Sequence, residues 1–200
     1  MMGGTVWSSD ALWNGVTLLN DAAVGVYGMI LSAAFCGITW TRGKKWAYGL
    51  SMAAILLAQA AVYGMTTDLQ LLKLLYPLVT HMPLVLVLAI LERKLLWPTI
   101  SVLTAYLCCQ LPRWVDLVIT AATRSPLLGE IGYTLFIGPI FFLLYRFFVR
   151  PAYAAVSSSH QSLMLFGSLP VVYYFFDYAT VVYSDALYRG IRALNEFLPT

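Results

Sequence analysis

Three ionisable side chains, His81, Glu130 and Asp177, lie inside long apolar segments of this sequence. A charged group at the centre of a bilayer costs about 2.5–3.5 kcal/mol on insertion scales, so such residues are the first candidates for function. His81 lies between Pro77 and Pro83, and two prolines this close together leave backbone carbonyls of a helix without partners. A histidine there can bind a ligand or respond to pH, or it can hydrogen-bond a freed carbonyl or a neighbouring helix.

The two acidic residues have different sequence surroundings. Glu130 follows Ser125 and Pro126, and we expect it in the first turn of a helix near the outer interface, where negative charge is favourable. Ligand contact is the alternative for this residue. Asp177 follows a run of tyrosine and phenylalanine and needs a partner, which can be a tyrosine hydroxyl, His81 or a basic residue near the surface. It either fixes helix packing or contacts a ligand on the outward side.

A further polar pair lies at the end of the fourth apolar segment. Gln110 can hydrogen-bond between helices, and Arg113 beside Trp114 suits the membrane interface, where tryptophan lies at headgroup depth. The candidates for ligand binding or signalling are therefore His81, Asp177, Gln110, Glu130 and Arg113.

Motifs for catalysis or metal binding do not occur in the sequence. There is no HExxH, Walker A or GxSxG pattern, so no catalytic residue is predicted in this chain. Cys36, Cys108 and Cys109 lie in apolar segments without CxxC spacing. We expect them to be buried thiols and predict no metal site.

The composition is that of an integral membrane protein. Hydrophobic residues make up 60% of the chain and charged residues 10%, with a mean hydropathy of +0.78, whereas soluble domains carry about 25% charged residues. The net charge of +3 is a weak basic excess. Because the basic residues are not clustered with solvent-facing aromatics, a nucleic-acid partner is not expected. The expected partner of the surface is the lipid bilayer.

Six apolar segments, each close to the ~20 residues that cross the hydrocarbon core, predict an all-α, polytopic transmembrane helix bundle. The predicted spans are residues 22–40, 46–65, 74–91, 95–111, 127–149 and 162–183. Four prolines inside these spans are candidate hinges, namely Pro77, Pro83, Pro139 and Pro170. Prolines are tolerated in such helices because neighbouring groups satisfy the freed carbonyls.

Three shorter segments leave their placement open. Residues 5–20 and 67–75 are mildly amphipathic, and residues 115–123 are too short to span, so they either lie on the membrane surface or dip into it. Residues 1–21 contain no Lys or Arg, which argues against a secretory signal peptide.

Lysine and arginine in short loops set the orientation of a membrane protein. The loops after the first, third and fifth spans are the basic ones, with Arg42, Lys44, Lys45, Arg93, Lys94, Arg146 and Arg150. This pattern predicts that these loops are cytoplasmic and that the N-terminus is outside. Residues 184–200 would then lie outside, where Arg189 and Arg192 oppose the rule. Because no polar tail follows, we expect the sequence to be a fragment of a longer protein.

Several uncommon strings resemble one known family. They are LYPLVTHMPL at residues 75–84, SVLTAYLCCQLPRW at 101–114, FGSLP at 166–170, FDYAT at 176–180 and ALNEFLP at 193–199. These strings resemble the N-terminal membrane region of bacterial, Firmicute-type sensor histidine kinases with a GHKL-type ATP-binding domain. The resemblance covers nearly the whole chain.

The resemblance implies a membrane sensor and signal-transducing module of a two-component system in the bacterial plasma membrane. It further implies a homodimer that acts on a response regulator through a kinase domain, which would follow a seventh span. ATP and Mg²⁺ would belong to that kinase domain, so no cofactor is expected in this chain. His81 and His160 are not in a setting that resembles the phosphoacceptor of the family, so no catalytic residue is carried over.

Short loops leave no room for a folded outer domain, so the stimulus would be a small ligand, a peptide on the outer loops or a lipid-phase signal. The proline-bearing spans would then shift between two discrete arrangements. The alternative is a small-molecule transporter or a substrate-binding membrane subunit, because transporters also use broken helices with midplane polar groups. The sequence shows no internal repeat, which disfavours this alternative. A membrane enzyme is disfavoured by the shortage of polar residues.

Overall fold

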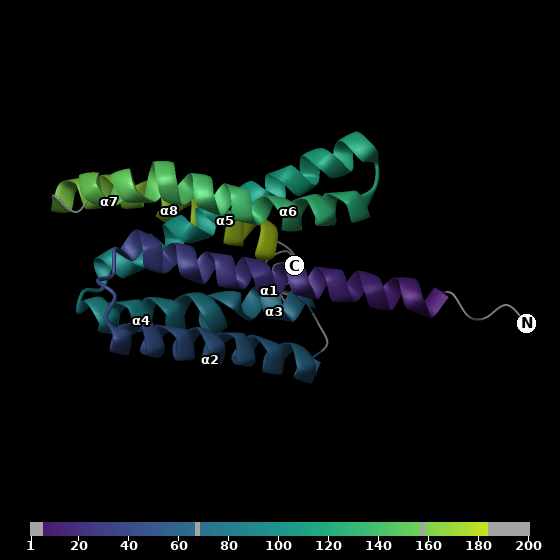
Figure 1. Cartoon of the computed structure of the whole chain (residues 1–200), viewed down its shortest axis with the longest axis horizontal. Coiled ribbons are helices and arrows are strands. Elements are labelled where there is room, and N and C mark those ends of the chain that lie inside the picture. Colours follow the sequence, from purple (N-terminus) through teal and green to yellow (C-terminus); the bar gives the residue numbers. More distant parts are fainter. Residues whose placement is uncertain (1–5, 67–68, 157–158, 184–200) are drawn as a thin grey trace, which may run out of the picture.

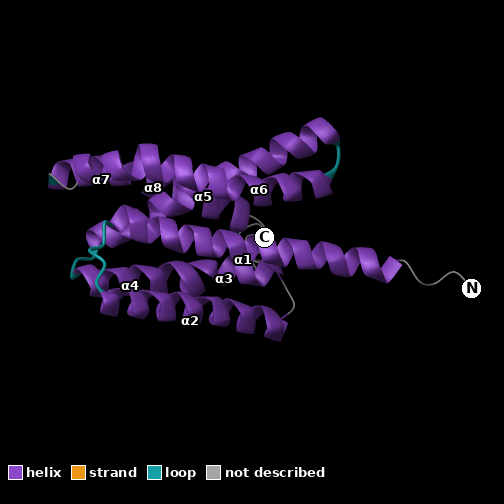
Figure 2. Cartoon of the chain, viewed as in Figure 1, coloured by secondary structure: helices purple, strands orange, loops and turns teal. Residues whose placement is uncertain are grey.

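A computed structural model describes residues 6–66, 69–156 and 159–183, and all regular structure within these ranges is helical, which confirms the predicted all-α class (Figure 2). The α-helices are α1 (Val6–Cys36), α2 (Arg42–Thr66), α3 (Leu69–Tyr76), α4 (Met82–Glu92), α5 (Leu96–Thr123), α6 (Pro126–Leu144), α7 (Arg150–Val156) and α8 (His160–Asp177). Three π-helical segments join or extend them, namely η1 (Pro77–His81), η2 (Tyr145–Val149) and η3 (Tyr178–Val182). Residues 184–200, including Arg189 and Arg192, lie outside the described residues.

Five helical stretches are long and apolar enough to cross a membrane. They are Leu19–Cys36, Arg42–Met65, Leu74–Glu92, Leu96–Thr123 and Pro126–Ala154. The sixth predicted span, residues 162–183, is helical as α8 and η3, but it is not among these five. The described residues thus form an all-helical protein with helices suited to a membrane.

Helix α5 continues through Pro112, so the predicted end of the fourth helix at this proline is wrong. Proline removes one backbone donor from a helix but does not end it when neighbouring packing holds the flanking turns. Pro112 is buried within the bundle, and α5 instead ends where Arg124 adopts a left-handed conformation and its N–H donates to the Thr120 carbonyl at 2.8 Å. Residues 115–123, whose placement the sequence left open, are the last turns of this helix.

Helix α1 also differs from its predicted bounds. It begins at Val6 and includes most of the amphipathic segment 5–20, and it ends at Cys36 rather than at Trp40. The end is set by Gly37, whose φ of +66° is a left-handed conformation that glycine adopts without steric cost. The chain then turns at once toward α2.

The π segment η1 lies between the two closely spaced prolines of the third span. The N–H of Met82 donates to the carbonyl of Pro77, five residues back, instead of four. Pro83 has no N–H to offer to the carbonyl of Val79, which favours a wider turn at this point. Pro139 and Pro170 lie inside α6 and α8 without interrupting them. Whether these prolines act as hinges stays a prediction.

Helices α1 and α5 form the centre of the bundle. In Figure 1, α2, α3 and α4 lie on one side of α1, and α6, α7 and α8 lie on the other. One buried cluster joins α1 to α2, α4 and α5 through Met29, Ala33, Cys36, Tyr48, Ile55, Leu84, Leu88 and Val102. A second joins α1 to α5, η2 and α7 through Tyr27, Leu31, Phe35, Ala105, Cys108, Val149 and Ala152. Helix α1 is therefore packed on two faces, and the helices around it form the outer surface of the bundle.

The outer helices expose large apolar side chains to the surroundings of the bundle. Leu57, Ile90 and Leu165 are 70%, 76% and 79% exposed, and many other leucine, valine and phenylalanine side chains share this property. Exposed large apolar side chains in this number favour contact with lipid or with another protein. The bundle is thus built for an apolar surrounding.

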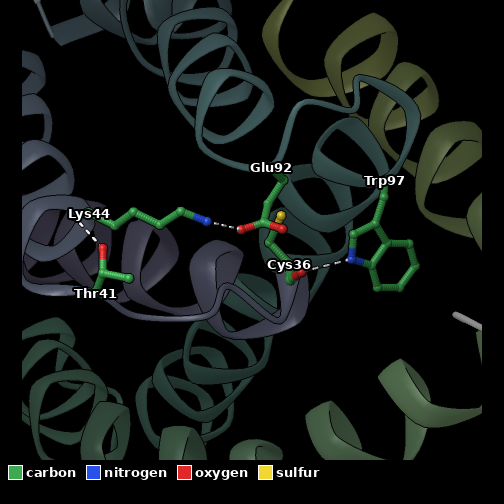
Figure 3. Close-up of polar contacts among 5 residues, drawn as sticks. All are labelled: Cys36, Thr41, Lys44, Glu92 and Trp97. Carbon is green, nitrogen blue, oxygen red and sulfur yellow. Dashed lines mark hydrogen bonds and ion pairs between the residues drawn. The ribbon is translucent and has the colours of Figure 1, made fainter.

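One end of the bundle carries a set of polar contacts between helix termini, drawn in Figure 3. Lys44 Nζ of α2 lies 3.0 Å from Glu92 Oε1 of α4. The indole Nε1–H of Trp97 in α5 donates to the carbonyl of Cys36 at the end of α1, at 3.0 Å. The α1–α2 and α4–α5 loops lie at this end, together with α7 and the start of α8 (Figure 1). Arg42, Lys44, Lys45, Arg93 and Lys94 are therefore gathered at the same end.

Candidate functional site

A cavity of about 960 Å³ lies between the helices, and four of the five predicted site residues line it. These four are His81, Gln110, Arg113 and Asp177, which come from η1, α5 and α8. Glu130 is not part of its wall. The structure thus brings together residues up to 96 positions apart that the sequence singled out separately.

The helices present their cavity-facing residues at helical spacing. Helix α5 contributes Tyr106, Gln110, Arg113 and Leu117, which recur every three or four residues and therefore share one face. Helix α1 contributes Asp21, Gly25, Gly28 and Ser32 in the same way. Small residues on α1 leave room for the opposite wall to approach, and Tyr76 Oη lies 3.4 Å from where a Cβ on Gly25 would be.

His81 is enclosed by tyrosine rings. Its ring centroid lies 5.2 Å from that of Tyr76, 5.3 Å from Tyr106, 5.4 Å from Tyr174 and 6.2 Å from Tyr178. Its Nδ1 lies 2.9 Å from the Tyr174 hydroxyl, in a bond where either group can donate. Of the roles left open for His81, a hydrogen bond to a neighbouring helix is present. The partner is a side chain of α8 and not a carbonyl freed by proline.

Asp177 has a tyrosine hydroxyl as its partner. The Tyr106 hydroxyl donates to Asp177 Oδ2, joining α5 to the C-terminal end of α8. Of the three partners that the sequence left open, the structure contains the first. Within the described part of the chain, no Lys or Arg side chain forms an ion pair with Asp177.

His81 and Tyr106 lie well away from the end of the bundle that carries the basic loops. His81 is 11 residues before the end of α4 at Glu92, and Tyr106 is 10 residues after the start of α5 at Leu96. At 1.5 Å per residue, both lie about 15–17 Å from the end that carries the basic loops. Half the thickness of a ~30 Å hydrocarbon core is about 15 Å, so these residues are suited to its middle.

Two polar residues in the cavity wall were not found from the sequence. Gln59 of α2 donates through Nε2 to Thr80 Oγ1 of η1 at 2.6 Å, and both side chains are buried. Asp21 of α1 also lines the cavity. The signal for Gln59 was available, since glutamine inside an apolar span marks a contact between helices. The signal for Asp21 was weaker, because the N-terminal boundary of the first span was uncertain.

Glu130 belongs to a separate polar cluster between α1 and α6. Asn20 Nδ2 donates to Glu130 Oε2 and, at 3.3 Å, to its backbone carbonyl, while the Thr134 hydroxyl donates to Asn20 Oδ1. The prediction that Glu130 lies in the first turn of its helix is wrong, because α6 begins at Pro126 and its first turn holds no acidic residue. The Glu130 carboxylate forms a hydrogen bond between α1 and α6 instead of stabilising a helix start.

Arg113 and Trp114 lie toward the other end of the cavity. Arg113 is two turns beyond Tyr106 on α5, about 10 Å further along the helix axis. Trp114 lines the cavity and is 64% exposed; its position near a membrane interface stays a prediction.

The cysteines and the metal chemistry of the described residues are simple. Cys36 and Cys108 are buried, and Cys109 is half-buried and lines the cavity; all three are free thiols. No group of three or more His, Cys, Asp and Glu side chains in the described ranges is arranged to hold a metal ion.

Comparison of the chain with protein-family models, with curated proteins and with solved structures gives no match in any of the three. Function is therefore inferred from the geometry of the cavity and from the residues of the chain.

Proposed function

We propose that this chain is a membrane sensor module that binds a small ligand in the cavity between its helices and transmits binding as a rearrangement of those helices. The observation that carries the proposal is the cavity itself, about 960 Å³ in volume and lined at mid-bundle by His81, Gln110 and Asp177. Small-molecule sites in proteins have volumes of about 300–1,000 Å³, mostly apolar walls and a few placed polar groups.

The wall of the cavity includes residues of two π segments, which supports a role in signalling. His81 is the last residue of η1, and Tyr178 is the first residue of η3. Single π turns occur often at functional sites, because they are less regular than the helix around them. A ligand that contacts both residues would touch η1, between α3 and α4, and η3, after α8. These are two places where the chain departs from α-helical geometry.

The finer proposal is the sensor region of a two-component histidine kinase, with six spans and the N-terminus outside. Its support is the gathering of Arg42, Lys44, Lys45, Arg93 and Lys94 at one end of the bundle, together with the family resemblance of strings such as residues 75–84 and 101–114. The proposal places the protein in a bacterial plasma membrane as a homodimer. The kinase domain, its ATP and the contact with a response regulator would lie beyond residue 200.

Labelling of single cysteines in whole cells tests the orientation. In a background without Cys36, Cys108 and Cys109, Thr39→Cys reports on the α1–α2 loop and Ser125→Cys on the α5–α6 turn. A membrane-impermeant maleimide should label Ser125→Cys in intact cells and Thr39→Cys only after permeabilisation. The opposite pattern would exclude an outside N-terminus and, with it, the kinase proposal.

The kinase proposal also has a genetic test. It predicts that the coding sequence after residue 200 continues into a seventh span, a helix with a phosphoacceptor histidine and an ATP-binding domain. A stop codon directly after residue 200 would contradict it and leave a stand-alone membrane protein.

Transport is the second candidate function, because a midplane cavity beside broken helices is also how transporters bind substrates. Uptake of a ligand by the purified chain in liposomes would favour the transporter. Saturable binding without uptake would favour the sensor.

A further inference from the structure

We propose that the cavity recognises a small organic cation, an amine or a quaternary ammonium group, through Asp177 and the tyrosine rings around it. The end of the cavity that holds Asp177 is called its inner end, and Arg113 lies toward the opposite end. This inference rests on the proposed function in one respect only, namely that the cavity is a ligand site. It adds the chemical class of the ligand.

The inner wall is aromatic. Tyr76, Tyr106, Tyr173 and Tyr178 line this end of the cavity. Tyr174 does not line it but packs against two of these rings, with its centroid 5.0 Å from that of Tyr106 and 4.6 Å from that of Tyr178. The faces of tyrosine rings carry negative potential and attract cations, and groups of such rings are the usual receptors for quaternary ammonium ligands.

Asp177 supplies a full negative charge beside these rings. Its Oδ2 accepts from the Tyr106 hydroxyl, its side chain lines the cavity, and no Lys or Arg of the described ranges forms an ion pair with it. A carboxylate inside a bundle is costly unless a counter-charge or several hydrogen bonds compensate it. A cationic ligand would provide that counter-charge next to the tyrosine rings.

The cavity wall also holds Asp21 on α1, a second acidic side chain that would attract a cation, together with Arg113 and His81. Arg113 lies about 10 Å from Tyr106 along the axis of α5, toward the opposite end. His81 directs its Nδ1 to the Tyr174 hydroxyl. An anionic ligand would be held by Arg113 but would meet Asp177 and the ring faces if it entered further. The charge pattern therefore favours a ligand whose positive group points inward.

A pair of probes with the same shape tests the role of charge. Choline and 3,3-dimethylbutan-1-ol differ in that carbon replaces the quaternary nitrogen, so only the first is a cation. Calorimetric titration of the chain, purified in maltoside micelles without choline lipids, should show saturable binding of choline. The neutral alcohol should bind at least tenfold more weakly.

Matched variants test which side chain of the protein provides the negative charge. Asp177→Asn keeps the shape of the side chain and removes its charge, so it should weaken choline binding at least tenfold. Glu130→Gln makes the same change in the Asn20 cluster outside the cavity and should leave the affinity unchanged. Tyr106→Phe keeps the ring, loses the bond to Asp177 and should give an intermediate loss.

The outcomes separate the two proposals. Equal affinity for choline and the neutral alcohol, unchanged choline affinity in Asp177→Asn, or no binding of choline would each overturn the cation proposal. Saturable binding of the neutral alcohol alone would overturn it and keep the cavity as a ligand site. If Asp177→Asn does not fold, as judged by helical circular dichroism and gel filtration, the comparison of the two probes on the unmodified chain still decides.

Discussion

His81 Nδ1 lies 2.9 Å from the hydroxyl of Tyr174, and this one bond joins η1 to α8 across 93 residues of sequence. It connects a segment loosened by two prolines to the helix that carries Asp177. The polar centre of the bundle therefore depends on a contact between two segments that are distant in sequence, and no local sequence pattern predicts this contact.

Tyr174→Phe should destabilise the protein modestly. The change removes the hydroxyl from His81 and keeps the ring contacts, so we expect a loss of about 0.5–1.5 kcal/mol, the usual net value of one hydrogen bond. Unfolding of the purified protein in mixed micelles measures it. Tyr173→Phe, one residue earlier, is the control and should change stability less. A larger effect of the control would show that the His81 bond carries little weight.

Gly129→Ala should be damaging, because α5 and α6 approach closely at this point. A Cβ at Gly129 would collide with Thr120 Oγ1 and Asp116 Oδ1 and would lie 3.1 Å from the Asp116 carbonyl oxygen. Overpacking of this kind costs about 1–3 kcal/mol. Gly138→Ala in the same helix meets nothing within 4 Å and should be neutral or stabilising by up to about 1 kcal/mol. Equal unfolding free energies of the two variants would contradict the close packing.

The Lys44–Glu92 pair should contribute little to stability. The two side chains are 27% and 24% exposed at the end of the bundle, where water and salt screen them. A double-mutant cycle with Lys44→Met and Glu92→Gln should give a coupling energy of about 0.2–1 kcal/mol, decreasing with added salt. The same cycle with the exposed Lys45 in place of Lys44 should show no coupling. A coupling above about 2 kcal/mol would require a site shielded from water.

Cys109 should be the most reactive of the three cysteines toward a small cationic thiol reagent. Its side chain lines the cavity and is half-buried, whereas Cys36 and Cys108 are 2% and 5% exposed. Mass spectrometry after treatment with a methanethiosulfonate ethylammonium reagent measures the modification, and Cys109→Ala should lose most of it. Equal modification of Cys108 would show that the reagent enters through unfolding and not through the cavity.

The sequence predicted the helical class and four residues of the cavity wall because both follow from local chemistry. Long apolar segments indicate helices in lipid, and polar groups inside them indicate contacts between helices or with a ligand. His81, Gln110, Arg113 and Asp177 were found in this way.

Other features depend on packing between distant segments and could not be predicted. Whether α5 ends at Pro112 depends on what surrounds the proline, and the residue is buried against other helices. The sequence around Glu130 is typical of a helix start, but in the structure the side-chain amide of Asn20 in α1 donates a hydrogen bond to its carboxylate. Gln59 and Thr80 pair across 21 residues, and only the fold brings them together.

The wide turn of η1 has a geometric consequence for the rings on either side of it. Tyr76 and His81 are five residues apart, and in regular α-helix side chains at that spacing point about 140° away from each other. Here their ring centroids lie 5.2 Å apart, because the wider turn, closed by the Met82 N–H and the Pro77 carbonyl, brings the two side chains toward the same side of the helix. Tightening this single turn would move Tyr76 away from His81 and rotate the part of the chain that precedes it. The angle between these two rings therefore reports on the conformation of the whole third span, which consists of α3, η1 and α4.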